Sequence, residues 1–191
     1  MRNAVCIGLV LASMAISGAE GQPRPDPHPD PHKAELDNLL AALKEAPSED
    51  AAAALETRIR EAWLQSGSPA VSLLVNRGLR DLNNNAGDEA LADFNAVITL
   101  DPTLAEAYNR RALARSMVGD LTGAVLDIGE SLRRDPRNFA AWQGLSRIAE
   151  AREDWKGALA AWQQVLTLDP KTPDGQKRLT LLKRKVFGEA T

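Results

Sequence analysis

The sequence predicts a fold built from structural repeats, and two observations support this prediction. Three Asp-Pro dipeptides recur at a strict interval of 34 residues, at Asp101-Pro102, Asp135-Pro136 and Asp169-Pro170. When the chain is aligned on these prolines, large and small residues also recur in step and without a gap. A fixed period of this length is typical of repeat proteins, in which each unit contributes one supersecondary element.

Four positions of the aligned units share the same residue size. Positions 4 and 24 are large and positions 8 and 20 are small; in chain order they hold Leu74, Gly78, Ala90 and Phe94, then Tyr108, Ala112, Ala124 and Ile128, then Trp142, Ser146, Ala158 and Trp162. Small residues let two antiparallel helices approach closely, and a bulky residue there would force them apart. The tryptophans occupy packing positions, so we predict that they belong to the core.

This pattern resembles the tetratricopeptide repeat (TPR), in which a large residue, a small residue, an Ala-x3-aromatic pair and a closing proline follow one another. The third unit is the most similar, with Trp142, Ala158, Trp162 and Pro170. The resemblance implies an all-α fold, a right-handed superhelical solenoid of helix-turn-helix repeats, and a role in binding other proteins. The three repeats would cover residues 71–104, 105–138 and 139–172.

The first 19 residues have the pattern of a secretory signal peptide. Arg2 precedes an apolar run from Ala4 to Ile16, and Ser17-Gly18-Ala19 supplies small residues before a cut ahead of Glu20. The run is shorter than the roughly 20 apolar residues of a spanning helix, so no membrane span is expected after cleavage; a retained anchor is the alternative. We expect an exported protein, periplasmic or secreted, similar to small exported bacterial TPR proteins.

Composition narrows the classes of function. With 44% hydrophobic and 26% charged residues, the chain fits one globular or repeat domain with extensions. Loss of Arg2 with the signal peptide leaves 22 basic and 26 acidic residues, so the net charge changes from −3 to −4. Nucleic-acid binding is not expected, because it normally requires a clustered basic surface. Cleavage also removes Cys6, the only cysteine, which excludes disulfides and thiolate chemistry.

Residues 20–32 are predicted to form a linker. Proline occupies every second position from Pro23 to Pro31, which disfavours a helix and favours an extended polyproline conformation. The linker contains both histidines, His28 and His32, so a metal site is an alternative to a spacer. In an extended chain their imidazoles would lie about 12 Å apart, and no metal or other cofactor is therefore expected.

Residues 33–67 are predicted to form a helical hairpin. Leucines recur at the spacing of one helix face, at Leu36, Leu39, Leu40 and Leu43. Ser48 can cap a second helix. Because Pro69 falls 33 residues before Pro102, the hairpin resembles a degenerate repeat, and we interpret it as an N-terminal cap on the solenoid. At the other end, residues 173–187 are predicted to form a capping helix with a polar outer face.

Positions 7 and 23 change together between the units. Units one and two hold Arg77 with Asp93 and Arg111 with Asp127, whereas unit three holds Leu145 with Ala161. We interpret this as an ion pair between the two helices of a unit that is replaced by an apolar contact.

The turn of unit one is predicted to be irregular or lengthened. Gly87-Asp88 falls two residues later than Gly119-Asp120 does in unit two, and three asparagines from Asn83 to Asn85 fill the gap. Asparagine tolerates left-handed backbone conformations, so a structural role is favoured over a binding role.

The resemblance also implies where a partner would bind. In TPR proteins the concave surface comes mainly from positions 2, 5, 9, 12 and 13 of each first helix, and it receives an extended peptide or a helix. The partner-binding residues expected on this basis are Val75, Leu79, Leu82, Asn83, Asn109, Leu113, Met117, Gln143, Arg147 and Glu150. A surface that is apolar at one end and polar at the other suits an amphipathic segment. The open alternative is that the hairpin folds over Val75, Leu79 and Leu82 and buries them.

The cationic clamp with which some TPR proteins hold a terminal carboxylate is not evident. Its usual positions hold Val75, Leu79, Ala140 and Gly144 instead of lysine, asparagine or arginine. An enzyme is disfavoured, since the chain after the linker has no histidine or cysteine; two buried carboxylates in a cleft would favour one. We expect a non-catalytic adaptor or scaffold that binds a protein segment, with a self-associating structural scaffold as the alternative.

Overall fold

The computed structural model describes residues 31–188, and its regular secondary structure is entirely α-helical. The helices in this range are α1 (Pro31–Lys44), α2 (Glu49–Trp63), α3 (Pro69–Asn83), α4 (Gly87–Leu100), α5 (Ala105–Met117), α6 (Leu121–Arg134), α7 (Phe139–Ala151), α8 (Trp155–Leu168) and α9 (Gly175–Phe187). Within these residues, none of the helices is both long and apolar enough to cross a bilayer. The predicted signal peptide and most of the predicted linker lie outside the described residues. His32, assigned to the linker, belongs to α1, because proline fits the first turn of a helix.

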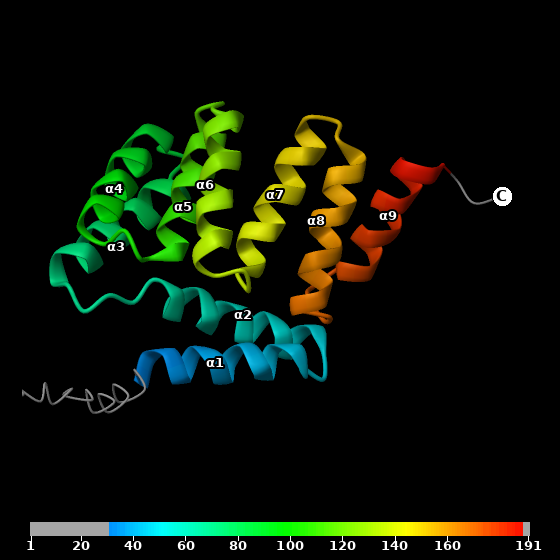
Figure 1. Cartoon of the computed structure of the whole chain (residues 1–191), viewed down its shortest axis with the longest axis horizontal. Helices are drawn as coiled ribbons and strands as arrows, with labels where there is room; N and C mark the ends of the chain where they lie inside the picture. The colour runs from blue at the N-terminus through cyan, green and yellow to red at the C-terminus, as the bar shows by residue number, and fades with distance from the viewer. Residues whose placement is uncertain (1–30, 189–191) are drawn as a thin grey trace, which may run out of the picture.

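Helices α3 to α8 form three antiparallel pairs that stand side by side, and α9 packs on the last pair (Figure 1). Each pair corresponds to one predicted unit, which confirms the all-helical repeat fold. The second helix of each pair ends at an Asp-Pro dipeptide, where φ is −138° at Asp101, −136° at Asp135 and −135° at Asp169. Since proline disfavours helical geometry in the residue before it, the chain leaves the helix there and the next helix starts in a new direction.

The predicted small positions are where the two helices of a unit meet. A Cβ atom on Gly78 would lie 2.9 Å from a ring carbon of Phe94, so α3 and α4 could not approach as closely with a larger residue. In the third repeat the Ser146 hydroxyl donates to the Ala158 carbonyl at 3.0 Å, which joins position 8 to position 20 directly. Trp162 is buried as predicted, and its indole N–H donates to the Gly175 carbonyl.

The prediction of a lengthened turn in unit one is wrong. Three residues separate the two helices in every unit, and the middle one has a left-handed backbone, with φ of 56° at Asn85, 84° at Gly119 and 58° at Glu153. Asparagine visits this conformation readily, so Asn85 replaces the glycine. Gly87 has a different role, because a Cβ atom there would lie 2.9 Å from Val118 of the next repeat.

The predicted ion pairs at positions 7 and 23 are present. Arg77 Nε donates to both carboxylate oxygens of Asp93, at 2.9 and 2.7 Å, and Arg111 Nε donates to Asp127 at 2.8 Å. Both aspartates are buried, while Arg77 reaches its partner from the surface. In the third repeat Ala161 is buried at the equivalent place. The carboxylates are therefore compensated inside the helix pairs and are not available for a ligand.

We predict that Arg77→Leu lowers the melting temperature more than the double change Arg77→Leu/Asp93→Ala. The single change leaves the buried Asp93 carboxylate without its cation, which is costly, whereas the double change removes both charges. Thermal unfolding followed by circular dichroism compares the two variants. Equal melting temperatures would show that the pair does not act as a unit.

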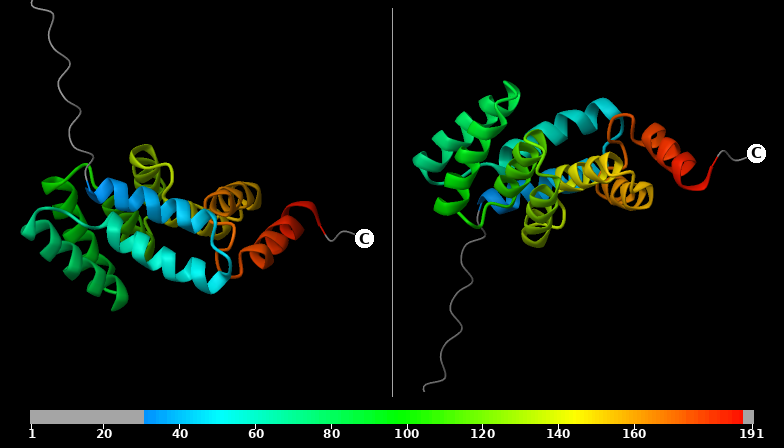
Figure 2. Two further views of the ribbon diagram at one scale, coloured as in Figure 1. Left: turned by 90° about the horizontal axis from the view of Figure 1, so that it is seen from below. Right: turned by 90° about the horizontal axis from the view of Figure 1, so that it is seen from above.

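The N-terminal hairpin does not continue the stack in front of α3. It runs across the ends of α5, α7 and α8, beside the corners formed by the Asp-Pro dipeptides (Figures 1 and 2). Ser48 caps α2 as predicted, by accepting from the Ala51 amide at 3.2 Å. One apolar cluster joins both hairpin helices to the start of α7; its buried members are Leu39, Leu43, Ala46, Ala52, Ile59, Trp63, Phe139 and Ala140.

Side-chain hydrogen bonds hold the hairpin at two of these corners. Trp63 donates to Asp135 at 3.1 Å and Arg137 donates to Asp37 at 2.6 Å, both at the corner before α7. At the corner after α8, the Thr172 hydroxyl donates to Glu56 at 2.8 Å. A capping hairpin would instead have packed on the first repeat. The large side chain that anchors it, Phe139, stands at position 1 of unit three.

Candidate functional site

The expected groove residues of the first repeat do not form an open apolar stripe. Val75 and Leu82 are buried in a core cluster with the α4 side chains of their own repeat, and Leu79 packs against that cluster. The hairpin contributes only Leu64 to this cluster. The alternative in which the hairpin folds over the three groove residues of the first repeat and buries them therefore holds only in part. A concavity of about 610 Å³ remains between the end of α2 and α3, where Val75 and Leu79 form part of one wall. Asn83 is exposed at the end of α3 and does not line it.

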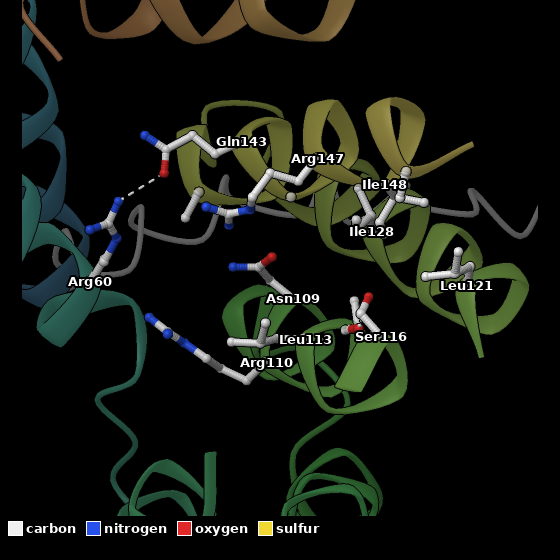
Figure 3. A pocket seen from close by; sticks show the side chains of 14 residues that line it. Arg60, Asn109, Arg110, Leu113, Ser116, Leu121, Ile128, Gln143, Arg147 and Ile148 are labelled. Carbon is white, nitrogen blue, oxygen red and sulfur yellow. Dashed lines mark hydrogen bonds between the residues drawn. The ribbon is translucent and has the colours of Figure 1, made fainter. Parts of the chain in front are cut away.

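The structure brings four of the expected residues together in a second concavity of about 530 Å³, which we call the α5–α7 pocket (Figure 3). The four residues are Asn109, Leu113, Gln143 and Arg147. The rest of the lining consists of Arg60, Arg110, Ala112, Ser116, Leu121, Ile128, Ala140, Gly144, Ile148 and Ala151. The pocket thus lies on the first helices of repeats two and three, closed at one end by α2.

Two expected residues lie elsewhere. Met117 packs at the turn between the first two repeats, where its Cβ is next to Gly87. Glu150 accepts a hydrogen bond from Arg178 of α9 and borders a third concavity between α7, α8 and α9. Both positions are occupied by contacts of the repeats with each other or with the last helix.

The charged side chains that line the α5–α7 pocket are three arginines, and no acidic side chain lines it. Arg60 lies 2.8 Å from Glu56 and also donates to Gln143 at 3.0 Å. Arg110 Nε lies 2.8 Å from Glu106, as an ion pair whose angle is not that of a hydrogen bond. Arg60 and Arg110 are therefore each compensated by a carboxylate on their own helix.

Arg147 has no such compensation from the described residues. Its side chain is exposed to solvent and makes no hydrogen bond or ion pair with them. Burial lowers the pKa of Arg147, and the positive charges of Arg178 and Arg60 lower it further; Glu150 opposes this shift, and Arg110 adds the smallest effect. The pocket therefore has a local excess of positive charge in a chain whose formal net charge is −3.

A buried polar network fixes the floor of the pocket. Glu106 is fully buried and accepts from Asn109 at 3.0 Å and from Asn138 at 2.7 Å. Asn138 also caps α7 by accepting from the Ala141 amide at 3.0 Å. The network ties repeat two to repeat three, so it holds the two pocket-lining helices at a fixed distance and orients Asn109.

The hairpin occupies the lower part of the concave surface of the third repeat. Ala140 is buried in the hairpin's apolar cluster, and Gln143 bonds both Arg60 and Thr172. Positions 2 and 5 of α7, which the family pattern assigns to a partner, are thus covered by the chain itself. The residues of α5 and α7 that remain open at the pocket include Leu113, Ser116, Arg147 and Ala151.

Two carboxyl groups meet where the hairpin reaches the end of α8. Burial and a hydrogen bond with Glu56 raise the pKa of Asp169 to about 7, and the negative charge of Glu56 adds to the effect. Glu56 also accepts hydrogen bonds from Arg60 and Thr172. Neither residue lines any of the three concavities described above.

The described residues give no indication of a metal site. No group of three His, Cys, Asp or Glu side chains between residues 31 and 188 could hold a metal ion. Of the two histidines considered for metal binding, His28 lies outside this range and His32 is the second residue of α1.

Sequence reasoning missed two of the three pocket arginines for different reasons. Arg110 stands at position 6 of unit two, which is not among positions 2, 5, 9, 12 and 13 from which the partner-binding residues were chosen. Arg60 comes from α2, and no repeat pattern says where α2 packs. The pairing of Arg60 with Glu56 one turn earlier was visible in the sequence, but only as an ordinary helix surface pair.

Solved structures with the same fold are TPR domains. They include the Sgt2 TPR domain from Aspergillus fumigatus (24% identical, TM-score 0.58, covering 62% of this chain and 80% of that chain). The TPR2B domain of yeast Sti1 in a complex with pHsp70 is 19% identical, with a TM-score of 0.56, and covers 62% of this chain and 96% of that chain. The first TPR of Spaghetti (RPAP3), bound to the HSP90 peptide SRMEEVD, is 18% identical with a TM-score of 0.58, covering 62% of this chain and 94% of that chain.

No family model matches the sequence. A curated relative nevertheless extends over most of the chain: a TPR repeat-containing protein of Rhizobium etli is 30% identical over 159 residues, which is 83% of this chain and 78% of the relative. The match is long enough to include the hairpin as well as the repeats. Together with the helix pairs and their Asp-Pro corners, it shows that this chain belongs to the TPR repeat-containing proteins.

Proposed function

We propose that this protein is an exported, periplasmic adaptor without catalytic activity, and that it binds a segment of a partner protein in the α5–α7 pocket. The observation that carries the proposal is the open pocket on the concave face, which combines polar groups with exposed apolar side chains. Two of the similar structures are complexes, that of Sti1 with pHsp70 and that of RPAP3 with the HSP90 peptide SRMEEVD, and this supports the binding of a protein segment here. Export rests on the signal-peptide pattern of residues 1–19.

The chemistry of the pocket suits a short amphipathic segment. Leu113 is 41% exposed at its edge, and Ile128 and Ile148 form an apolar wall. Asn109 and Ser116 supply hydrogen-bonding groups at the same opening. A helix or extended peptide with one apolar side chain and flanking polar groups could fill a concavity of about 530 Å³.

Photo-crosslinking in cells of the native host tests this proposal. Benzoylphenylalanine at Leu113 should give an adduct with a partner protein, whereas the same residue at Leu126 should not. The two leucines make a matched pair, since both are exposed and both belong to the second repeat, but Leu126 lies on α6 and outside the pocket. Equal adducts at both positions, or an adduct at Leu126 alone, would contradict the proposal. An adduct between two copies of this chain would support the self-associating scaffold instead.

A further inference from the structure

The charge of the α5–α7 pocket indicates which kind of partner segment it accepts. The guanidinium groups of Arg60, Arg110 and Arg147 reach from three different helices toward the same opening (Figure 3). Two of them are already compensated, by Glu56 and Glu106, and Arg147 is not. An uncompensated arginine beside two further cations attracts an anion more strongly than an isolated surface arginine does.

The site differs from a simple basic surface patch in its apolar surroundings. Gly144 lies between Arg147 and the start of α7, and its Cα faces Ile128, which would be 3.3 Å from a Cβ atom at this position. Gly144, Leu113 and Ile148 line the same concavity as Arg147. A protein segment with a carboxylate next to an apolar side chain would complement this lining.

We infer that Arg147 pairs with a carboxylate side chain of an acidic, partly apolar segment of the partner protein, whose apolar residue packs between Leu113 and Ile148. This inference rests on the proposed function and adds the chemistry of the ligand. The hairpin takes part in recognition, because Arg60 reaches the pocket from α2. Arginine suits the role, since its planar group can donate two parallel hydrogen bonds to a carboxylate.

Selection from a random dodecapeptide library tests the inference with the purified protein. Wild type should select peptides enriched in Asp and Glu next to an apolar residue. The best of them should bind Arg147→Glu at least about tenfold more weakly in fluorescence anisotropy, since reversing one charge of a close pair costs at least about 1.4 kcal/mol. Arg80→Glu is the matched control, because Arg80 is exposed on α3, lines neither the α5–α7 pocket nor the concavity beside α3, and gives the same change in net charge.

The outcomes separate this inference from the function on which it rests. Selected peptides without acidic enrichment, or equal losses for Arg147→Glu and Arg80→Glu, would overturn the inference and leave an adaptor with another specificity. Competition by inorganic phosphate as strong as that by free glutamate would assign the pocket to a phosphate group and overturn it as well. Selection of no peptide by wild type would contradict the proposed function itself. If the charge reversal in Arg147→Glu disturbs folding, Arg147→Gln replaces it in the binding measurement. The thermal unfolding curve of Arg147→Gln, followed by circular dichroism, should match that of wild type.

Discussion

Phe139→Ala is expected to release the N-terminal hairpin from the repeats. Phe139 is fully buried, and the centroid of its ring lies 5.1 Å from that of Trp63. The Arg60 guanidinium carbon lies over the same ring, 5.0 Å from its centroid. Truncation of a buried phenylalanine costs about 3–5 kcal/mol, because the contacts are lost and a cavity is left. Most of this loss should fall on the hairpin, since its apolar cluster depends on Phe139.

Native-state hydrogen exchange followed by mass spectrometry measures this effect helix by helix. Phe139→Ala should remove protection from α1 and α2 before α3 and α4. Phe94→Ala is a matched control, because Phe94 is equally buried but belongs to the core of the first repeat. Phe94→Ala should remove protection from α3 and α4 before α1 and α2. If both variants lose protection in the same order, the hairpin is not a separately anchored unit.

Raising the pH from about 4 to about 7 is expected to destabilise the protein through Asp169. Its pKa is raised from 3.8 to about 7 in the folded chain, so over this range the folded state holds a proton that the unfolded state has released. Stability then falls as the pH rises, and the loss is complete above the folded pKa. The shift of about three units corresponds to at most about 4 kcal/mol.

Asp169→Asn should flatten this pH dependence. The amide carries no charge, can donate to Glu56, and needs no proton from solvent. At pH 8 the variant should melt higher than wild type, by roughly 2–4 °C for each kcal/mol gained, and at pH 4 the two should agree. Asp101→Asn is the control, because Asp101 holds the equivalent position in the first repeat, is not buried, and already accepts from the Thr103 amide at 3.1 Å. If the melting temperatures of wild type and Asp169→Asn differ equally at pH 4 and pH 8, the buried proton is not the cause.

The repeat interval was sufficient to predict most of the architecture. It placed the helix pairs, the corners at Asp101, Asp135 and Asp169, and the close contact at Gly78, because each of these follows from local geometry that recurs in every unit. The paired changes at Arg77 and Asp93 predicted a contact between helices for the same reason. The turn at Asn85 was mispredicted because glycine and asparagine serve the same left-handed position, so aligning the glycines shifted the register.

The position of the hairpin could not be predicted from the repeats. It depends on contacts between segments about 80 to 115 residues apart in sequence, such as Arg60 with Gln143 and Glu56 with Thr172. The sequence did contain one signal, since position 1 is Val71, Ala105 and then Phe139, and only the last is large enough to anchor a covering helix. The same contacts bring Arg60 of α2 into the pocket, where it bonds Gln143.

The most direct test of the account is a ¹H–¹⁵N NMR titration with the partner segment captured at Leu113. Chemical-shift changes should concentrate on the backbone amides of α5 and α7 and on the side-chain Nε–H of Arg147, the residue that lacks a carboxylate partner in the free protein. Shifts confined to α8 and α9, around the third concavity, would place the partner outside the α5–α7 pocket and contradict it.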